Sequence, residues 1–310
     1  MSAALSDTLV ELRYGARRVL LAPHVGGSIA AFDEIRDGRS IDWLRPATPA
    51  ALDARDPLGM ASFPLLPYCN RIRDARFSFG GAIVDLSGDG NAFAHALHGN
   101  AWRLPWKVVE GSNSRARLHF LHAPSGAAGH HWPFAYEATQ DIVLDAHTLT
   151  VTICARNLSD RPMPFGMGHH PYYPRTRNTR VHARVAAMWH STPDLLPTHA
   201  GAHPCVDAMA SKEGMCPDAF DLDNNFAGWS RTATIAWPDE GRAITLSAEA
   251  PFDHMVVYAP ASHPDLLCVE PVSNVADWVN LHVDHAMKGG AVLKPGESVT
   301  ASFAWTTRFG

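Results

Sequence analysis

The sequence predicts an all-β protein, folded as a single large antiparallel β-sandwich domain over residues 1–310. Apolar and polar residues alternate more often than they follow a helical period, and 23 glycines and 23 prolines are spread along the chain. No strand–helix–strand rhythm, internal repeat or Gly/Ser linker interrupts this pattern. We expect the proline-rich residues 193–204 (PDLLPTHAGAHP) to form a long surface loop. The length also leaves open two sandwiches in tandem.

Three hairpins are predicted from pairs of alternating segments joined by turn residues. Residues 76–86 (RFSFGGAIVDL) contain two strands around Gly80-Gly81, a pair that suits a tight hairpin turn. Residues 141–153 (DIVLDAHTLTVTI) and 233–248 (ATIAWPDEGRAITLSA) have the same form.

Two further segments predict long strands with one buried face. In residues 148–157, Leu149, Val151 and Ile153 share a face, and threonines occupy the other. Residues 298–307 place four apolar side chains on one face, namely Val299, Ala301, Phe303 and Trp305. Period-two alternation of this kind is typical of strands that border a core.

The composition excludes several classes of partner. The net charge is -5 and the isoelectric point about 6.4, so no basic footprint favours nucleic acid or an anionic membrane. Five widely spaced cysteines without a C-x-x-C pair argue against a zinc knuckle or a disulfide framework. The N-terminus lacks a signal-peptide layout, and no apolar run approaches the roughly 20 residues that span a bilayer. We expect a soluble cytoplasmic protein, either a monomer or a homodimer.

Eighteen histidines call for a metal check. His130-His131 and His169-His170 are adjacent pairs, whose side chains diverge on a strand. The motifs H-x-H and H-E-x-x-H are absent, so no metal site is predicted. Phosphate-binding glycine motifs and the G-x-S-x-G elbow of serine hydrolases are also missing, and we expect no cofactor.

Glu270 is the first candidate catalytic residue. It follows the apolar run of residues 266–269, which predicts a buried strand ending at Glu270-Pro271. Partial desolvation at such a strand end raises a carboxyl pKa toward the range of a general base. Taken alone, Glu270 is equally consistent with a structural salt bridge.

Asn70, Arg71 and Arg73 form a second candidate group in the segment NRIR. On a strand, Arg71 and Arg73 would share one face and Asn70 would take the other. A guanidinium fork suits hydroxyls or carboxylates in a polar pocket, although an exposed basic face fits the same residues.

Two other segments carry polar groups next to turn formers. His98 precedes Gly99, which permits a sharp turn beside it, and a lone histidine there also fits a structural role. Asp221 and Asp223 lie in DLDNNF. Acid-and-amide runs are typical of turns and solvated loops, and sugar-binding sites use the same groups to hold vicinal hydroxyls.

Taken in order, these segments resemble the aldose 1-epimerase (galactose mutarotase) family. The order is the specific part: NRI, LHG with a nearby Trp, HPYY, DNNF, CVEP and a late LKPGES, spanning residues 64–298. Residues 19–32 (VLLAPHVGGSIAAF) also resemble the opening strands of that family. The variant spellings DNNFAGW and GHHPYYP suggest a less studied branch.

The resemblance implies a galactose mutarotase-like β-sandwich (supersandwich) with a monosaccharide bound in an open cleft. It implies interconversion of the α and β anomers of a free aldose, with Glu270 as general base and His170 as general acid. Asn70, Arg71, His98 and Asp223 correspond to groups that hold the sugar. The doublet leaves His169 as an adjacent candidate for the acid, and alternation allows only one of the two to face the cleft.

The reaction suits these residue types without a cofactor. The C1 hydroxyl loses a proton while the ring oxygen gains one, so a carboxylate and a protonated imidazole on either side of the hemiacetal suffice. We expect an ionised Glu270, a protonated His170, and an acid such as Asp223 that raises the pKa of His170.

One departure from the family concerns its cleft glutamine, which is missing before Tyr258. His254 or Asp253 is the expected substitute. Three alternatives stay open: a non-catalytic sugar-binding or regulatory protein on the same scaffold, a hexose-6-phosphate 1-epimerase, and a glycoside hydrolase using Asp223 and Glu270.

Overall fold

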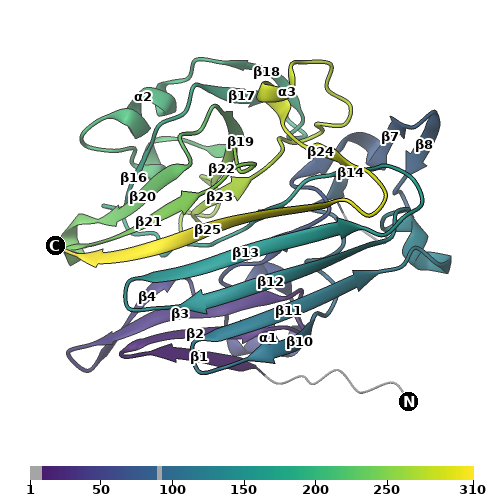
Figure 1. Cartoon of the computed structure of the whole chain (residues 1–310). Helices are drawn as coiled ribbons and strands as arrows, with labels where there is room; N and C mark the ends of the chain where they lie inside the picture. Colours follow the sequence, from purple (N-terminus) through teal and green to yellow (C-terminus); the bar gives the residue numbers. More distant parts are fainter. Residues whose placement is uncertain (1–8, 89–92) are drawn as a thin grey trace.

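A computed structural model describes residues 9–88 and 93–310. Most of its elements are strands, and three larger antiparallel sheets contain most of these strands (Figure 1). The predicted all-β class is therefore confirmed. Helices are few and short, and none in the described part of the chain is long and apolar enough to cross a membrane.

The eight-stranded sheet contains the longest strands. Its order is β10-β11-β12-β13-β25-β21-β20-β16. Burial alternates along β13 and β25, as their sequences predict, and the two pair with Val151 opposite Phe303. The strands are β10 (Lys107–Gly111), β11 (Arg115–His122), β12 (Tyr136–Leu144), β13 (Thr148–Asn157), β16 (Arg180–Ala183), β20 (Thr232–Trp237), β21 (Arg242–Ala248) and β25 (Ser298–Phe309).

The N-terminal sheet is a four-stranded meander beside the eight-stranded sheet in Figure 1. Its strands are β1 (Val10–Tyr14), β2 (Arg17–Ala22), β3 (Ser28–Arg36) and β4 (Arg39–Leu44).

The seven-stranded sheet positions the candidate site. Its order is β18-β17-β19-β22-β23-β15-β5, which brings together segments from residue 64 to residue 272. The strands are β5 (Pro64–Leu65), β15 (Gly168–His169), β17 (Ala187–Ser191), β18 (Pro197–Gly201), β19 (Leu222–Ala227), β22 (His254–Ala259) and β23 (Cys268–Val272).

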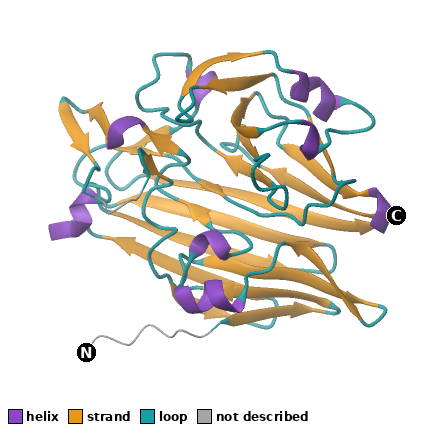
Figure 2. Cartoon of the chain, turned by 180° about the vertical axis from the view of Figure 1, so that it is seen from behind, coloured by secondary structure: helices purple, strands orange, loops and turns teal. Residues whose placement is uncertain are grey.

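Short elements complete the fold, and Figure 2 shows the helices at the periphery of the strands. The helices are α1 (Pro49–Ala54), α2 (Pro204–Ala210) and α3 (His285–Lys288), with 3-10 turns η1 (Pro57–Gly59), η2 (Arg73–Ala75), η3 (Gly126–His130), η4 (Pro217–Ala219) and η5 (Pro238–Glu240). The remaining strands pair two by two: β6 (Arg71–Ile72) with β9 (Ala96–Leu97), β7 (Arg76–Phe79) with β8 (Ala82–Asp85), and β14 (Met163–Phe165) with β24 (Ala291–Leu293).

All three predicted hairpins are confirmed: β7–β8, β12–β13 and β20–β21. The loop expected at residues 193–204 is wrong in part, because Pro197 begins β18 and Pro204 begins α2. Both prolines occupy first positions, where a missing N–H costs little.

One hydrophobic cluster draws on all three larger sheets. Fully buried examples are Phe32 of β3, Trp305 of β25 and Val269 of β23. The seven-stranded sheet packs on the eight-stranded sheet through contacts such as His169 against Phe303, with ring centroids 5.2 Å apart. The candidate site lies on the opposite face of the seven-stranded sheet.

Candidate active site

A cleft of about 490 Å³ opens above the seven-stranded sheet. The six site residues predicted from the sequence all line it: Asn70, Arg71, His98, His170, Asp223 and Glu270. They come from five segments that are far apart in the chain, and sheet pairing brings those segments together.

Strand register forms the floor of the cleft. Asp223 of β19 lies opposite Tyr258 of β22, and Tyr258 lies opposite Cys268 of β23. Glu270 is two residues beyond Cys268 and therefore shares its face. The sequence placed Glu270 at a strand end, but β23 continues to Val272. Glu270 therefore lies in the middle of a buried strand rather than at the end of one.

His170 and Glu270 are in direct contact. His170 Nε2 lies 3.3 Å from Glu270 Oε1, and the Glu270 side chain is only 2% exposed. The other two polar atoms of the pair, His170 Nδ1 and Glu270 Oε2, are buried without a hydrogen-bond partner in the described structure. Such a pair has unused hydrogen-bonding capacity at the base of a cleft, where a polar ligand can satisfy it.

Aromatic stacking fixes the plane of the His170 ring. Phe63 and Tyr172 both stack against it, with ring centroids 4.7 and 4.8 Å from that of His170, and their own centroids are 6.4 Å apart. The His170 amide donates to the Phe63 carbonyl at 2.9 Å. Because two stacking rings and this backbone hydrogen bond hold His170, Nε2 keeps its direction toward Glu270 when the cleft is empty.

His169 faces the opposite way, as alternation predicts. It is fully buried beneath the cleft, where Nε2 donates to Gln140 Oε1 at 3.2 Å and Nδ1 accepts from the Ser62 hydroxyl. Gln140 in turn donates to the Gly27 carbonyl at 3.0 Å, which fixes its oxygen toward His169. Burial lowers the pKa of His169 to about 3, so this histidine is a neutral structural residue.

Asn70 and His98 hold one another through two hydrogen bonds, one of which uses the His98 ring. The backbone N–H of Asn70 donates to His98 Nδ1 at 3.0 Å, and the backbone N–H of His98 donates to the backbone carbonyl of Asn70 at 2.9 Å. His98 Nδ1 is therefore an acceptor, which places the ring proton on Nε2. Burial lowers the pKa of His98 well below its usual value, so His98 presents a neutral N–H donor at neutral pH.

The turn after His98 requires glycine. Gly99 has φ +69°, and a Cβ at that position would lie 2.1 Å from the Leu66 carbonyl oxygen. The LHG motif thus sets a close backbone approach, which explains its spacing in the sequence.

Arg71 reaches across the cleft to Asp223. Its Nη2 donates to Asp223 Oδ2 at 3.3 Å, and its Nη1 donates to Asn70 Oδ1 at 3.0 Å. The expectation that Arg71 and Arg73 share one face, with Asn70 opposite, is wrong. Asn70 has φ +62° and η2 begins at Arg73, so the backbone is not extended on either side of β6, and Arg73 pairs instead with Asp277.

Burial shifts the acid–base pair toward its neutral form. Desolvation lowers the pKa of His170 to about 3 and raises the pKa of Glu270 well above its usual value, with a further upward contribution from Asp223. The expectation that Asp223 raises the pKa of His170 is wrong. The pKa of His170 is lowered, and the pKa that Asp223 raises is that of Glu270. In the empty cleft the pair therefore carries a single proton, which resides on Glu270.

His170, Glu270 and Cys268 also place three potential metal-ligand atoms within 4.8 Å of one another. Burial raises the pKa of the Cys268 thiol well above its usual value, and the negative charge of Glu270 adds to this rise. The thiol is therefore protonated in the empty cleft.

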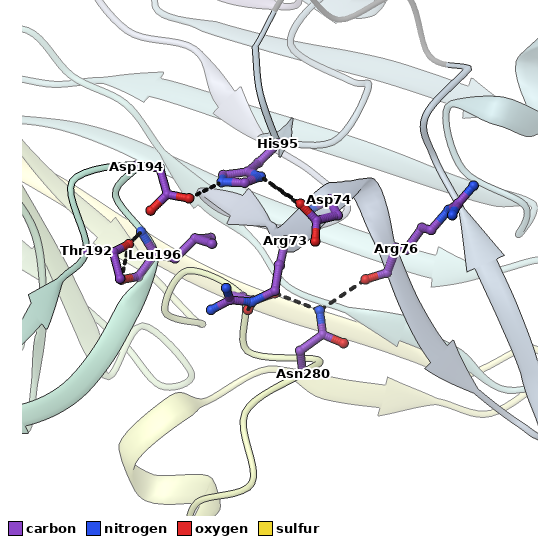
Figure 3. Close-up of polar contacts among 9 residues, drawn as sticks. Arg73, Asp74, Arg76, His95, Thr192, Asp194, Leu196 and Asn280 are labelled. Atoms are coloured by element: carbon purple, nitrogen blue, oxygen red, sulfur yellow. Dashed lines mark hydrogen bonds and ion pairs between the residues drawn. The ribbon is translucent and has the colours of Figure 1, made fainter.

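A polar network supports the rim of the cleft (Figure 3). His95 Nε2 donates to Asp194 at 3.2 Å, and the Asp74 amide donates to His95 Nδ1 at 3.2 Å. Asp194 lies in a turn closed by Thr192 and Leu196, whose Leu195 lines the cleft. Since His95 precedes β9 and His98, the network ties this turn to a segment of the cleft wall.

Several lining residues escaped the sequence interpretation. Arg45 and Tyr172 line the cleft. For Tyr172 the sequence contains a signal, its position two residues after His170, but for Arg45 it contains none. The expected substitutes for the family glutamine are wrong, because Asp253 pairs with Arg231 at 2.5 Å and His254 is buried beside Gly289. Tyr258, from the same strand as His254, does line the cleft.

A family model and a relative from Escherichia coli match most of this chain. The family model "Aldose 1-epimerase" matches residues 8–306. The uncharacterized protein YphB of Escherichia coli (strain K12) is 32% identical over 250 residues, which cover 78% of this chain and 82% of that protein.

Solved structures match over nearly the whole chain. A crystal structure from Escherichia coli K12, provisionally assigned as an aldose 1-epimerase, is 27% identical with a TM-score of 0.84, covering 98% of this chain and 99% of the other. A galactose mutarotase-like protein from Clostridium acetobutylicum is 18% identical with a TM-score of 0.86, covering 97% and 95%. The second similarity shows the fold.

Proposed function

Because this chain belongs to the aldose 1-epimerase family, we propose that it interconverts the α and β anomers of a free aldose. The observation that carries the proposal is the buried contact of 3.3 Å between His170 and Glu270 at the base of the cleft. A site that only binds sugar has no need of two buried titratable groups in contact.

Ring opening uses the two groups together. The Glu270 carboxylate takes the proton of the C1 hydroxyl, the C1–O1 bond becomes a carbonyl, and the bond from C1 to the ring oxygen breaks. His170 Nε2 gives its proton to the departing ring oxygen. The two sugar oxygens are bonded to the same carbon, so a donor and an acceptor 3.3 Å apart are placed to serve both.

Ring closure reverses the proton transfers on the other face. Rotation about C1–C2 turns the aldehyde, the ring oxygen attacks C1 and returns its proton to His170, and O1 takes the proton from Glu270. The pair holds one proton throughout, so no exchange with solvent is required. The neutral pair favoured by burial is the state needed while the open-chain aldehyde is bound.

The remaining four residues are proposed to hold the sugar. His98 offers its Nε2–H, Arg71 and Asn70 offer donors, and the Asp223 carboxylate accepts from hydroxyls. The Arg71–Asp223 contact of 3.3 Å orients both side chains before substrate binds.

Polarimetry tests the proposal directly. Freshly dissolved α-D-galactose, α-D-glucose and L-arabinose should reach anomeric equilibrium faster with the protein than in buffer alone, in proportion to enzyme concentration. No acceleration with any aldose would refute the enzymatic proposal and favour a non-catalytic sugar-binding protein.

The pH profile should be broad. Activity requires one proton on the pair. A second proton binds only as the pH falls toward the lowered pKa of His170, about 3, and the shared proton leaves only above the raised pKa of Glu270. We expect kcat/KM, corrected for spontaneous exchange, to stay within about threefold from roughly pH 5 to 8. Limbs at the ordinary values of 4.5 and 6.5 would contradict this pair assignment; circular dichroism controls for unfolding.

A further inference from the structure

Arg45 is the lining residue whose role the proposed reaction leaves unexplained. It follows β4 and is half-buried. Its Nη2 donates to the Leu58 and Met60 carbonyls at 3.0 and 3.3 Å, and its guanidinium lies 4.1 Å above the centre of the Tyr172 ring. These contacts fix the guanidinium at the cleft and use one of its three nitrogens.

The charge of Arg45 has no counterion in the part of the chain that the structure describes. Within residues 9–88 and 93–310, no carboxylate lies within ion-pair distance of it. Arg71, the other arginine of the cleft, is already paired with Asp223. A preoriented guanidinium without a carboxylate partner is suited to an anionic group of a ligand.

The two arginines act on different parts of the cleft. The charge of Arg45 adds to the lowering of the pKa of His170, and it partly offsets the rise that burial causes in the pKa values of Tyr172 and Cys268. The charge of Arg71 acts on another set of groups: it adds to the lowering of the pKa of His98 and partly offsets the rise in the pKa of Glu270. Arg45 is thus on the His170 side, since its guanidinium and the His170 ring both contact the Tyr172 ring.

We propose that the cleft selects aldoses that carry a monoanionic group at C6, such as the carboxylate of a hexuronic acid, and that Arg45 binds this group. The inference rests on the proposed function. If His170 serves the ring oxygen, C5 and its substituent C6 lie on the His170 side, since C5 is bonded to that oxygen. One unpaired guanidinium matches one negative charge, whereas a phosphate dianion calls for more.

The substrate test compares matched pairs of sugars. D-galacturonate against D-galactose and D-glucuronate against D-glucose differ only at C6. We expect kcat/KM for at least one uronate to exceed that of its neutral partner tenfold or more, with the advantage shrinking as salt rises. Galactose 6-phosphate and glucose 6-phosphate form the third arm. A preference for a 6-phosphate over the uronate would overturn the monoanion assignment.

Arg45→Gln should lower the uronate-to-hexose ratio of kcat/KM by about ten- to a hundredfold, the usual loss for a hydrogen-bonded charged group. Arg39→Gln makes the same chemical change at an exposed site on β4 and should preserve the ratio. A ratio unaffected by Arg45→Gln would refute the inference.

Binding separates this inference from the proposed function. In the Glu270→Gln background, calorimetric affinity for the uronate should fall with Arg45→Gln and persist with Arg39→Gln. If the protein turns over neutral aldoses but Arg45→Gln and Arg39→Gln bind the uronate equally well, only the Arg45 inference is overturned. The affinity difference in a protein that accelerates no exchange would overturn only the proposed reaction.

Discussion

Replacing Glu270 by glutamine is expected to lower kcat for anomer exchange by about 10²–10⁴-fold, the usual contribution of a positioned general base. Glutamine has nearly the same shape but cannot take the C1 hydroxyl proton. The change also removes a buried ionisable group with an unpartnered Oε2. The thermal midpoint should therefore stay equal or rise, and calorimetry would show this.

The chain supplies a matched control for this variant. Glu137 and His119 form a second glutamate–histidine pair, also 3.3 Å apart, on the partly exposed surface of the eight-stranded sheet. Glu137→Gln should leave exchange within about twofold of wild type. Near wild-type exchange in Glu270→Gln would show that another group is the base.

Replacing His170 by asparagine is expected to cost a similar factor of about 10²–10⁴ in kcat, because no group then protonates the ring oxygen. Asparagine also leaves space beside Phe63 and Tyr172, so His170→Gln serves as a bulkier second variant. The double variant with Glu270→Gln should be little worse than either single one, since the two residues act as a unit.

The neighbouring histidine gives the contrast. His169→Asn breaks the buried hydrogen bonds to Gln140 and Ser62, and should lower stability by about 1–3 kcal/mol while the folded fraction keeps most of its activity. His119→Asn should change neither. A folded His169→Asn protein as inactive as His170→Asn would overturn the assignment of the acid.

Local pattern was sufficient for the fold class. Alternation predicted the buried faces of β13 and β25 and the three hairpins, because side-chain direction in a strand follows directly from its period of two. The same rule separated His169 from His170. The family resemblance, carried by ordered motifs, is confirmed by the match over residues 8–306, while the single-domain organisation stays a prediction.

Local pattern failed where backbone conformation or pairing departs from the regular strand. The run DLDNNF is typical of a loop, yet it forms β19, because pairing with β22 and β17 offsets its weak strand propensity. Asn70 and Arg71 share the cleft because Asn70 has positive φ. Sequence periodicity alone does not indicate such a residue.

By itself the sequence determined the strand class, the family and a set of six candidate side chains, since each of these depends on residue type and spacing along the chain. Only the tertiary structure decided which groups touch and how they are charged. The His170–Glu270 contact depends on the pairing of β15 with β23, across about a hundred residues of chain. Burial then reverses the expected protonation of this pair, and Arg45 joins the cleft from a distant meander. Desolvation and charge proximity are three-dimensional quantities, and no local stretch of sequence contains them.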